Sequence, residues 1–435
     1  MIIHSAKKVA KSIIHLAHAG KLVSFLLFIL FTTIVQSAHA QSHSLQYYVN
    51  HAINSSPKIS QQRNRIDSVR LQKKIINANL DLPTISASAD YLYAPFLGPH
   101  FGYAEPVTNG GNYAARLNIS YPLFTHKRKK VRYHATSIVQ QQARYHIQKL
   151  KHALRDTVTH QYIIVYNDMK KLQYLAHIGQ LLKQQKKVVR SLARQGITKI
   201  TDVKQIRIQY QSNRIAQKQA QKTYRQDLSK LNTQSGLSHT AANIKLQMPT
   251  IPVDTSSTVQ PSRFMDQFKF DSLKTTAKKQ VYNLKYQPSV SAMGNTGLLA
   301  NNFTGIENNF GYEVGVHISV PIYDGNKRKI VRQQTQLQQN TIDTFQQRFR
   351  KKRKSHLNNL RKQLRQTDQQ LQMIQKQIAQ YKDLLKNYRS ELKQGLVSTV
   401  NYLIVLRQYT NARQQQVQTR GEKLMLENKY NYWNW

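Results

Sequence analysis

The sequence of 435 residues contains no cysteine. This absence excludes disulfide scaffolds, cysteine nucleophiles, Cys-ligated zinc and iron–sulfur clusters. It also argues against a bacterial lipoprotein, whose lipid is carried on an N-terminal cysteine. Acidic residues are scarce as well: 20 Asp or Glu stand against 65 Lys or Arg, a formal net charge of +45. That balance is typical of proteins that bind nucleic acid or anionic membranes, so nucleic-acid binding is one hypothesis to weigh.

Long apolar runs are missing too, apart from one near the N-terminus. This run, LVSFLLFILFTTIV at residues 22–35, follows four lysines and precedes SAHA, in which Ala38 and Ala40 form an A-x-A pattern. Its length of about 14 residues is short of the roughly 20 that span a bilayer. We therefore expect residues 1–40 to be a cleavable signal peptide. An uncleaved anchor is the alternative; in the signal-peptide interpretation the mature chain is exported, away from cytoplasmic DNA.

Proline is absent between Pro122 and Pro249 and again after Pro321. Because proline disrupts helix interiors, two very long segments are free to be helical. In the first, from about His126 to Gln195, apolar residues recur mostly three or four positions apart. This spacing predicts an amphipathic helix with coiled-coil character, on the order of 100 Å long. The apolar stripe consists of Val131, Ala135, Ile138, Ala143, Ile147, Leu150, Leu154, Val158, Tyr162, Val165, Met169 and Leu172.

A glycine interrupts each long proline-free segment: Gly196 in RQGITKITDV and Gly395 in KQGLVSTVNY. Both glycines suit a helix C-terminus, and Asp202 or Asn401 lies near the start of the next helix. The pattern predicts two helical hairpins in which the chain runs out and returns.

Matching features recur 199 residues apart, which indicates a duplicated unit of about 200 residues. ISYPLFTHKRK at residues 119–129 and ISVPIYDGNKRK at residues 318–329 are near copies, and the two hairpin glycines keep the same spacing. We expect four parts: a signal peptide (1–40); a first repeat with N-terminal helices, two strands and a long hairpin (41–246); a linker (247–270); and a second repeat with a short helix, two strands and a long hairpin (271–435).

Four segments alternate apolar and polar residues, as strands with two unlike faces do. They are TISASADYLY at 84–93, ARLNISYPL at 115–123, PSVSAMGN at 288–295 and YEVGVHISV at 312–320. Alternation of this kind fits transmembrane barrel strands and equally fits a soluble antiparallel sheet with one wet face. Proline lacks the N–H that a strand ladder needs, so we expect the strand-to-helix boundaries at Pro122, Pro321, Asp324 and Gly325.

Taken in order, these segments resemble the TolC family of outer-membrane channels from about Ser44 onward. The helix pair LQYYVNHAINSSPKIS, the strand ends LNISYPLF and VHISVPIYDGNKRK, and the turns QGITKITDV and QGLVSTVNYL carry the resemblance. It implies an α+β membrane protein with long helical hairpins and four transmembrane β-strands per chain, closing a 12-stranded barrel as a homotrimer. It further implies an outer-membrane location with a periplasmic helical domain.

The implied function is a passive, gated exit duct of a tripartite efflux or type I secretion system. The partners would be a periplasmic adaptor, an inner-membrane pump and outer-membrane lipid, with no nucleic acid, no cofactor and no enzymatic activity. The tip residues that would contact the adaptor and form the aperture are Gly196, Ile197, Thr198, Asp202, Gly395, Leu396, Val397 and Asn401. The residues that would line the barrel lumen are Arg116, Asn118, Ser120, Glu313, His317 and Ser319.

The sequence departs from the family pattern in two places. THKRKK follows the first strand pair where an Asp-Gly-Gly-like turn is usual, and the second tip carries Asn401 and Ile404 where two carboxylates are common. The cations after each strand pair oppose the helix dipole, and contact with anionic lipid headgroups would offset that cost.

Two other hypotheses remain open on the sequence alone. One is a periplasmic or secreted basic coiled-coil structural or adaptor protein; the other is a basic nucleic-acid binder. RKKRKS at residues 350–355 resembles a nucleic-acid patch, but on a long helix we expect it to be a solvated face. The sixteen histidines show no metal-ligand spacing, so we expect no metal site.

Overall fold

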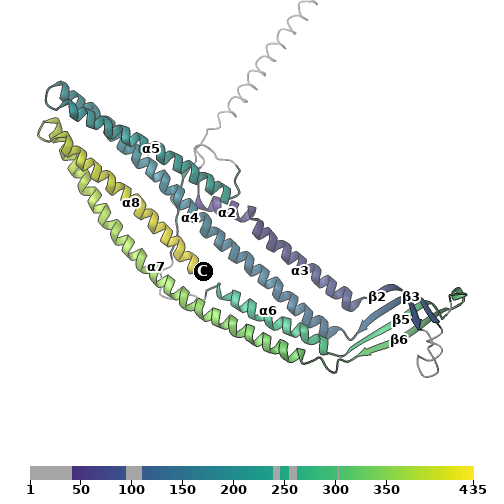
Figure 1. Cartoon of the computed structure of the whole chain (residues 1–435). Coiled ribbons are helices and arrows are strands. Elements are labelled where there is room, and N and C mark those ends of the chain that lie inside the picture. Colours follow the sequence, from purple (N-terminus) through teal and green to yellow (C-terminus); the bar gives the residue numbers. More distant parts are fainter. Residues whose placement is uncertain (1–41, 95–109, 239–244, 254–261, 302) are drawn as a thin grey trace, which may run out of the picture.

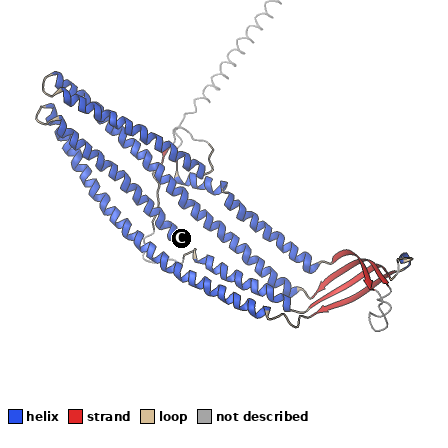
Figure 2. Cartoon of the chain, viewed as in Figure 1, coloured by secondary structure: helices blue, strands red, loops and turns tan. Residues whose placement is uncertain are grey.

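The computed structural model describes residues 42–94, 110–238, 245–253, 262–301 and 303–435 (Figure 1). The predicted signal peptide lies outside these residues. Helices make up one long curved body, and a small sheet extends from one end of it (Figure 2). In the described ranges, no helix combines the length and apolarity needed to cross a bilayer.

Four long helices form two antiparallel hairpins, as the absence of proline predicted. The first hairpin joins α4 (His126–Arg194) to α5 (Ile200–Gln234), and the second joins α7 (Lys327–Lys393) to α8 (Thr399–Trp433). At 1.5 Å per residue, the 69 residues of α4 extend about 100 Å. None of the residues in its predicted apolar stripe is exposed, which confirms the periodicity argument.

Three shorter helices complete the helical body. Helix α2 (Leu45–Ser55) begins where the Ser44 side chain accepts a hydrogen bond from the Tyr47 N–H, and α3 (Pro57–Asp81) begins with proline at its first position. Helix α6 (Met265–Asn283) begins inside the segment that we expected to be linker. The predicted boundary of the second repeat at residue 271 therefore cuts through this helix.

A four-stranded antiparallel sheet has the order β2 (Thr84–Ala94), β3 (Gly110–Leu123), β5 (Ser289–Ala300) and β6 (Phe310–Ser319). Each strand adjoins one helix along the chain: α3 leads into β2, β3 into α4, α6 into β5 and β6 into α7. The helices pack in the matching order α3, α4, α6, α7. The sheet and this helical layer thus form one continuous wall. At one end of the wall the strands are hydrogen-bonded to one another, and in the rest of it the helices pack side by side.

The elements too short to carry a periodic pattern were not predicted. Strand β1 (Ser42–His43) pairs in parallel with β4 (Lys245–Leu246), and the 3-10 turns η1 (Leu284–Tyr286) and η2 (Ile306–Asn308) flank strand β5. The β1–β4 pair brings the start of the described chain beside the end of the first hairpin.

The apolar core is divided into clusters along the helices. One cluster joins the two hairpins near their tips and includes Ile206, Leu392 and Tyr402. A second surrounds Tyr48 and Tyr162, whose side chains are fully buried where α2 packs on α4. Narrow clusters of this kind account for the modest apolar fraction of the sequence, because most side chains lie near a surface.

The aromatic C-terminal segment packs against the beginning of α6. The carbonyl oxygen of Trp435 accepts hydrogen bonds from the Ser262 hydroxyl at 2.7 Å and the Arg263 N–H at 3.1 Å. The Trp435 ring stacks on His152 and meets Phe264 edge-on. The chain therefore ends at the middle of the body (Figure 1).

Arg353 corrects the expectation that RKKRKS is simply a solvated face. Its side chain is only 6% exposed, and its Nε donates to the Trp433 carbonyl oxygen at 2.8 Å. The other members of this basic run are exposed, so Arg353 is the one cation of the run that packs against α8.

Candidate functional site

The sheet separates its side chains into a polar face and an apolar face. Strand register places Ser88 opposite Arg116, Asn118 opposite Asn295, and Asn295 opposite Glu313. Because residues two apart share a face, all six residues expected to line a lumen lie on this one face. They are Arg116, Asn118, Ser120, Glu313, His317 and Ser319.

Polar side chains on this face bond to one another across the strands. Arg116 makes an ion pair with Asp90 at 3.3 Å, and Asn118 donates to the Ser88 hydroxyl at 2.9 Å. Among the described strands, the Asp, Glu, Lys and Arg residues on this face are Asp90, Arg116 and Glu313, and His317 lies on it as well. The face is therefore hydrophilic but close to electrically neutral.

The opposite face is apolar and largely uncovered. Register aligns Ile119 with Ile85 and with Gly294, and Gly294 with Val314. On the edge strand β6, Tyr312 is 83% exposed and Val314 is 84% exposed. The other exposed large side chains of this face are Ile85, Tyr91, Tyr93, Leu117, Ile119, Tyr121, Phe310, Val316 and Ile318. An apolar surface of this extent requires cover by a membrane or another protein.

The strand-to-helix boundaries differ in the two halves of the chain. Pro122 lies inside β3, paired with Ser291, and the strand continues to Leu123, so this proline does not end the ladder. Phe124 then adopts a left-handed backbone with φ of 55°. Pro321 lies two residues beyond the end of β6, as expected for a residue that terminates pairing.

The second boundary has a capped helix start that the first one lacks. The Asp324 carboxylate accepts a hydrogen bond from the Arg328 N–H at 2.8 Å, and Gly325 adopts a φ of +67°. Hydrogen bonding by Tyr286 and by the Arg328 N–H lowers the pKa of Asp324. Helix α4 begins at His126, and its N-cap residue Thr125 makes no side-chain capping hydrogen bond. The THKRKK departure thus removes a cap from the first copy.

Two of the cations at the first boundary contact protein groups. Arg128 donates to the carbonyl oxygens of Gln287 at 2.8 Å and Pro288 at 3.1 Å, and Lys129 pairs with Asp81 at 2.6 Å. These contacts tie α4 to the turn before β5 on one side and to α3 on the other. The expected role in binding lipid headgroups is therefore left to exposed cations such as Lys127 and Lys327.

The two hairpin turns have the same backbone construction. Gly196 has a φ of +73° and Gly395 of +77°, the left-handed conformation that glycine favours at helix ends. In the first turn the Ile197 N–H donates to the Leu192 carbonyl, and in the second the Leu396 N–H donates to Glu391, both at 2.9 Å. These six-residue closures are the Schellman motif.

The N-cap residues of the helices after the turns lie three residues before the predicted polar positions. Helix α5 starts after Lys199 and α8 after Ser398, whose hydroxyl accepts a hydrogen bond from the Asn401 N–H at 3.2 Å. Asp202 and Asn401 therefore lie in the first helical turn. Asp202 is well placed there, because the N-terminal end of a helix favours a negative charge.

The two tips lie against each other. A Cβ atom on Gly395 would be 3.2 Å from the Ile197 Cγ2. Leu396 is 72% exposed and Ile197 49%, whereas Thr198 and Val397 are half-buried. The eight predicted tip residues are thus gathered at one end of the molecule, opposite the sheet (Figure 1).

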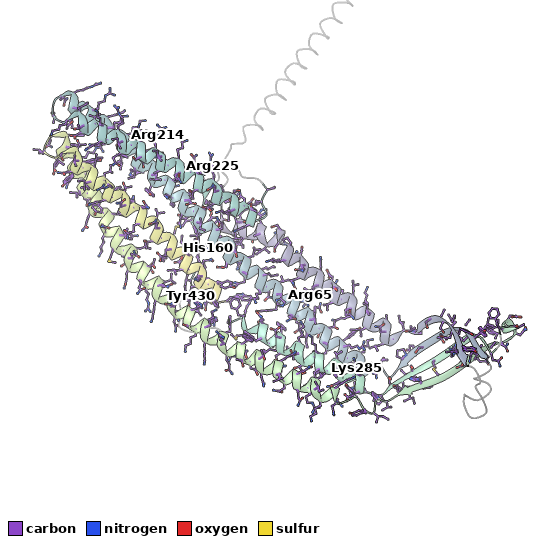
Figure 3. All side chains as sticks on the ribbon, viewed as in Figure 1. Arg65, His160, Arg214, Arg225, Lys285 and Tyr430 are labelled. Atoms are coloured by element: carbon purple, nitrogen blue, oxygen red, sulfur yellow. The ribbon has the colours of Figure 1, made fainter. Side chains whose placement is uncertain are left out.

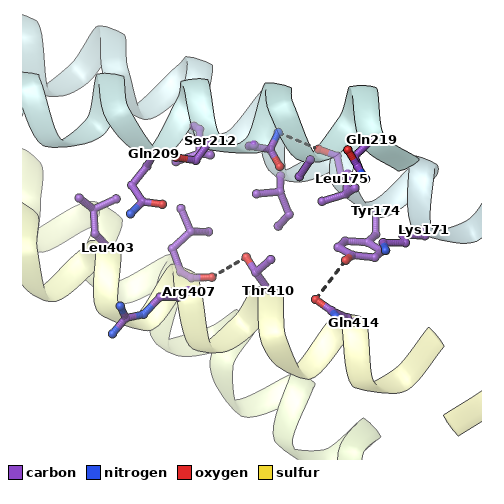
Figure 4. Close-up of a pocket in the computed structure, with 15 residues that line it drawn as sticks. Lys171, Tyr174, Leu175, Gln209, Ser212, Gln219, Leu403, Arg407, Thr410 and Gln414 are labelled. Atoms are coloured by element: carbon purple, nitrogen blue, oxygen red, sulfur yellow. Dashed lines mark hydrogen bonds between the residues drawn. The ribbon is translucent and has the colours of Figure 1, made fainter. Parts of the chain in front are cut away.

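A groove between the hairpins was not predicted. It has a volume of about 380 Å³ and is lined by α4, α5 and α8 (Figure 4). Tyr174 Oη lies 3.5 Å from Gln414 Oε1 across it, a link between the first hairpin and the second. This contact forms because α4 packs against α8, and no local sequence pattern predicts it.

Cationic side chains line the helices throughout, including Arg214 and Arg225 on α5 (Figure 3). Within the described ranges, no group of three or more His, Asp or Glu residues is placed to hold a metal ion.

Comparison with known proteins agrees with this geometry. Residues 275–428 match the protein family described as "Outer membrane efflux protein". The sequence has no significant match among curated proteins.

Several solved structures share the fold over most of the chain. The CmeC outer membrane channel of Campylobacter jejuni is 14% identical, with a TM-score of 0.68 over 90% of this chain and 85% of that one. VceC of Vibrio cholerae is 11% identical, with a TM-score of 0.68 over 90% and 95%. The MtrE channel of Neisseria gonorrhoeae is 15% identical, with a TM-score of 0.65 over 90% and 88%. The resemblance suggested by the sequence is confirmed.

Proposed function

We propose that this chain, which matches the outer membrane efflux protein family over residues 275–428 and shares the fold of solved outer-membrane channels, is an outer-membrane efflux channel. It would act as a passive, gated exit duct of a tripartite efflux or type I secretion system. The family consists of channels and not of enzymes, and no catalytic role is proposed.

The exposed two-faced sheet is the observation that carries this proposal. Its strands have 10 to 14 residues, enough to cross a bilayer when tilted. Strands β2 and β6 have no neighbour beyond them in the described sheet. Unpaired backbone groups are too costly in hydrocarbon, so the sheet must close on itself through further copies.

Three copies would close a barrel of twelve strands. Strand β6 of one chain would pair with β2 of the next, and the antiparallel alternation of the sheet would continue unbroken. The apolar face would then contact lipid, and Arg116, Asn118, Ser120, Glu313, His317 and Ser319 would line the lumen. The helical layer would continue the wall as a tunnel in the periplasm.

The opposite end would meet the partner proteins. The tip residues Gly196, Ile197, Thr198, Asp202, Gly395, Leu396, Val397 and Asn401 would contact a periplasmic adaptor and form the aperture. An inner-membrane pump would supply the transport energy, and residues 1–40 would direct export as a cleaved signal peptide.

An internal duplication would explain the near equality of the two halves. Helices α4 and α7 have 69 and 67 residues, and α5 and α8 have 35 each. The repeats would cover 41–246 and 271–435 as expected from the sequence, with the second extended to the start of α6.

A matched pair of variants on β6 tests the membrane-spanning sheet. Val314→Arg places a charge on the apolar face and should abolish stable insertion, because an arginine near the bilayer midplane costs roughly 2–4 kcal/mol. His317→Arg, on the polar face of the same strand, should insert and assemble normally. Outer-membrane fractionation, the oligomeric state in detergent and conductance in planar bilayers are the measurements. A soluble monomer that tolerates both substitutions would support the coiled-coil adaptor alternative instead.

A further inference from the structure

The tips carry a strong excess of positive charge. Residues 183–208 and 382–407, which include the two turns, contain thirteen Lys or Arg residues and only three acidic ones. The acidic residues are Asp202, Asp383 and Glu391. Each chain therefore carries a net charge of +10 at its tip end.

These tip charges are not neutralised within the chain. None of the ion pairs formed by the described residues involves a side chain from either tip segment. Twelve of the thirteen cations are exposed, and the remaining one, Lys186, is half-buried against the Tyr210 ring. Their field consequently reaches the solvent at this end.

The other end of the wall is different. The polar face of the sheet has one arginine and two carboxylates, and its arginine is paired with Asp90. The tips, which touch at Gly395 and Ile197, instead carry a large excess of cations at the end of the wall opposite the sheet.

Screening decides which of these cations act on an opening. A helix with its side chains is about 10–12 Å across, and the Debye length in physiological salt is about 8 Å. In a wall one helix thick, cations on the inner face and on the sides of the helices therefore set the potential inside a narrow opening, and those on the outer face are largely screened. Low-dielectric walls focus such a field and raise the local concentration of counter-ions.

We propose that the tip end is an anion-selective entrance, so that the cargo of this duct consists of solutes with net negative charge. The inference rests on the proposed function, since it requires a channel that opens at the tips. Rings of Lys or Arg are how pores select anions, and the two tip segments hold thirteen such residues against three acidic ones.

Reversal potentials of the full-length channel in planar bilayers under a potassium chloride gradient test the proposal. We expect chloride to permeate about tenfold better than potassium in dilute salt, because potentials of several kT raise counter-ion concentration by that order. The preference should fall toward about onefold in 1 M salt, where the Debye length is about 3 Å.

A double variant and its control locate the selectivity. Lys199→Glu with Lys204→Glu reverses two exposed cations at the start of α5, where the helix dipole favours acidic residues, so the fold should survive. Lys351→Glu with Lys354→Glu makes the same charge change at exposed positions in the middle of α7. The tip variant should lower the chloride preference at least twofold, and the control should change it less.

Each other outcome overturns the inference in a distinct way. A conducting channel with no preference, or with a preference for potassium, refutes anion selection while leaving the proposed function intact. Equal shifts in the two double variants refute selection at the tip. A tip variant that fails to export in cells but keeps its chloride preference assigns the cations to docking a partner. Absence of any conductance in the wild-type protein refutes the proposed function itself.

Discussion

Two tyrosines that touch in the same buried cluster differ in one respect, and this difference gives a sharp test of the structure. The rings of Tyr48 and Tyr162 lie 5.7 Å apart, and both side chains are fully buried. The Tyr162 hydroxyl is 2.7 Å from the Gln247 carbonyl oxygen and 3.0 Å from that of His43. Among the described residues, the Tyr48 hydroxyl has no hydrogen-bond partner.

Removing each hydroxyl should therefore have opposite consequences. Tyr162→Phe removes the donor shared by two part-buried carbonyl oxygens, which costs about 1–3 kcal/mol of unfolding free energy. Tyr48→Phe removes an unpaired buried polar atom and should be neutral or stabilising by up to about 1 kcal/mol. Both changes delete one oxygen and keep the ring, so packing is matched.

Thermal unfolding followed by circular dichroism in one detergent measures the effect. We expect Tyr162→Phe to lower the Tm by about 2–6 °C and Tyr48→Phe to leave it unchanged or slightly raised. A similar fall for both variants would show that the hydrogen bonds to residues 43 and 247 do not hold the entering chain and the linker against α4. A fall for Tyr48→Phe alone would mean that the two hydroxyl environments are assigned the wrong way round.

Further perturbations probe the tip, the hairpin contact and the buried acid. Gly196→Val should destabilise the first turn by about 1–2 kcal/mol, because its φ of +73° suits glycine; Tm measurement checks this, and no loss would contradict the left-handed turn. Gly421→Ala should cost about 1–3 kcal/mol, since a Cβ would lie 1.8 Å from the Asn167 side-chain nitrogen; adding Asn167→Ala should restore most of the Tm, and failure of that rescue would locate the strain elsewhere. Burial, followed by the neighbouring Asp227, raises the pKa of Asp168 to about 6 from 3.8. Its contribution to stability is thus present at low pH and lost as pH rises through about 6, so Asp168→Asn should raise the Tm more at pH 7.5 than at pH 5; a pH-independent effect would refute the shift.

The long helices, the hairpin turns and the strands were predictable because each depends on residues that are close together in the sequence. The proline-free segments predicted where the long helices run, the apolar stripe of α4 predicted its buried face, and the two glycines predicted the turns. The structure has both hairpins at these positions. Strand alternation likewise predicted which residues share a face, because the side-chain period of a strand is two. The register then brought Arg116 and Glu313 to one face of the sheet.

What the sequence could not give were contacts between distant segments. The hydrogen bonds of Arg128 to the turn before β5 join residues about 160 positions apart, and nothing in HKRKK distinguishes this arginine from its neighbours. Arg353 is buried for the same reason: only the arrival of α8 covers it. Pro122 was misassigned as a strand terminator because its strand continues one residue beyond it.

The unpaired edges of the sheet have a genetic consequence. The edge strands β2 and β6 have backbone groups that must be hydrogen-bonded before they enter hydrocarbon. If β6 pairs with β2 of another chain, folding of the barrel and assembly of the proposed trimer occur in one step. A subunit with a mutation in one edge strand could still pair through its other edge with wild-type subunits. The mixed trimers that result would not close. Such alleles should be dominant, whereas alleles that prevent export of the chain should be recessive.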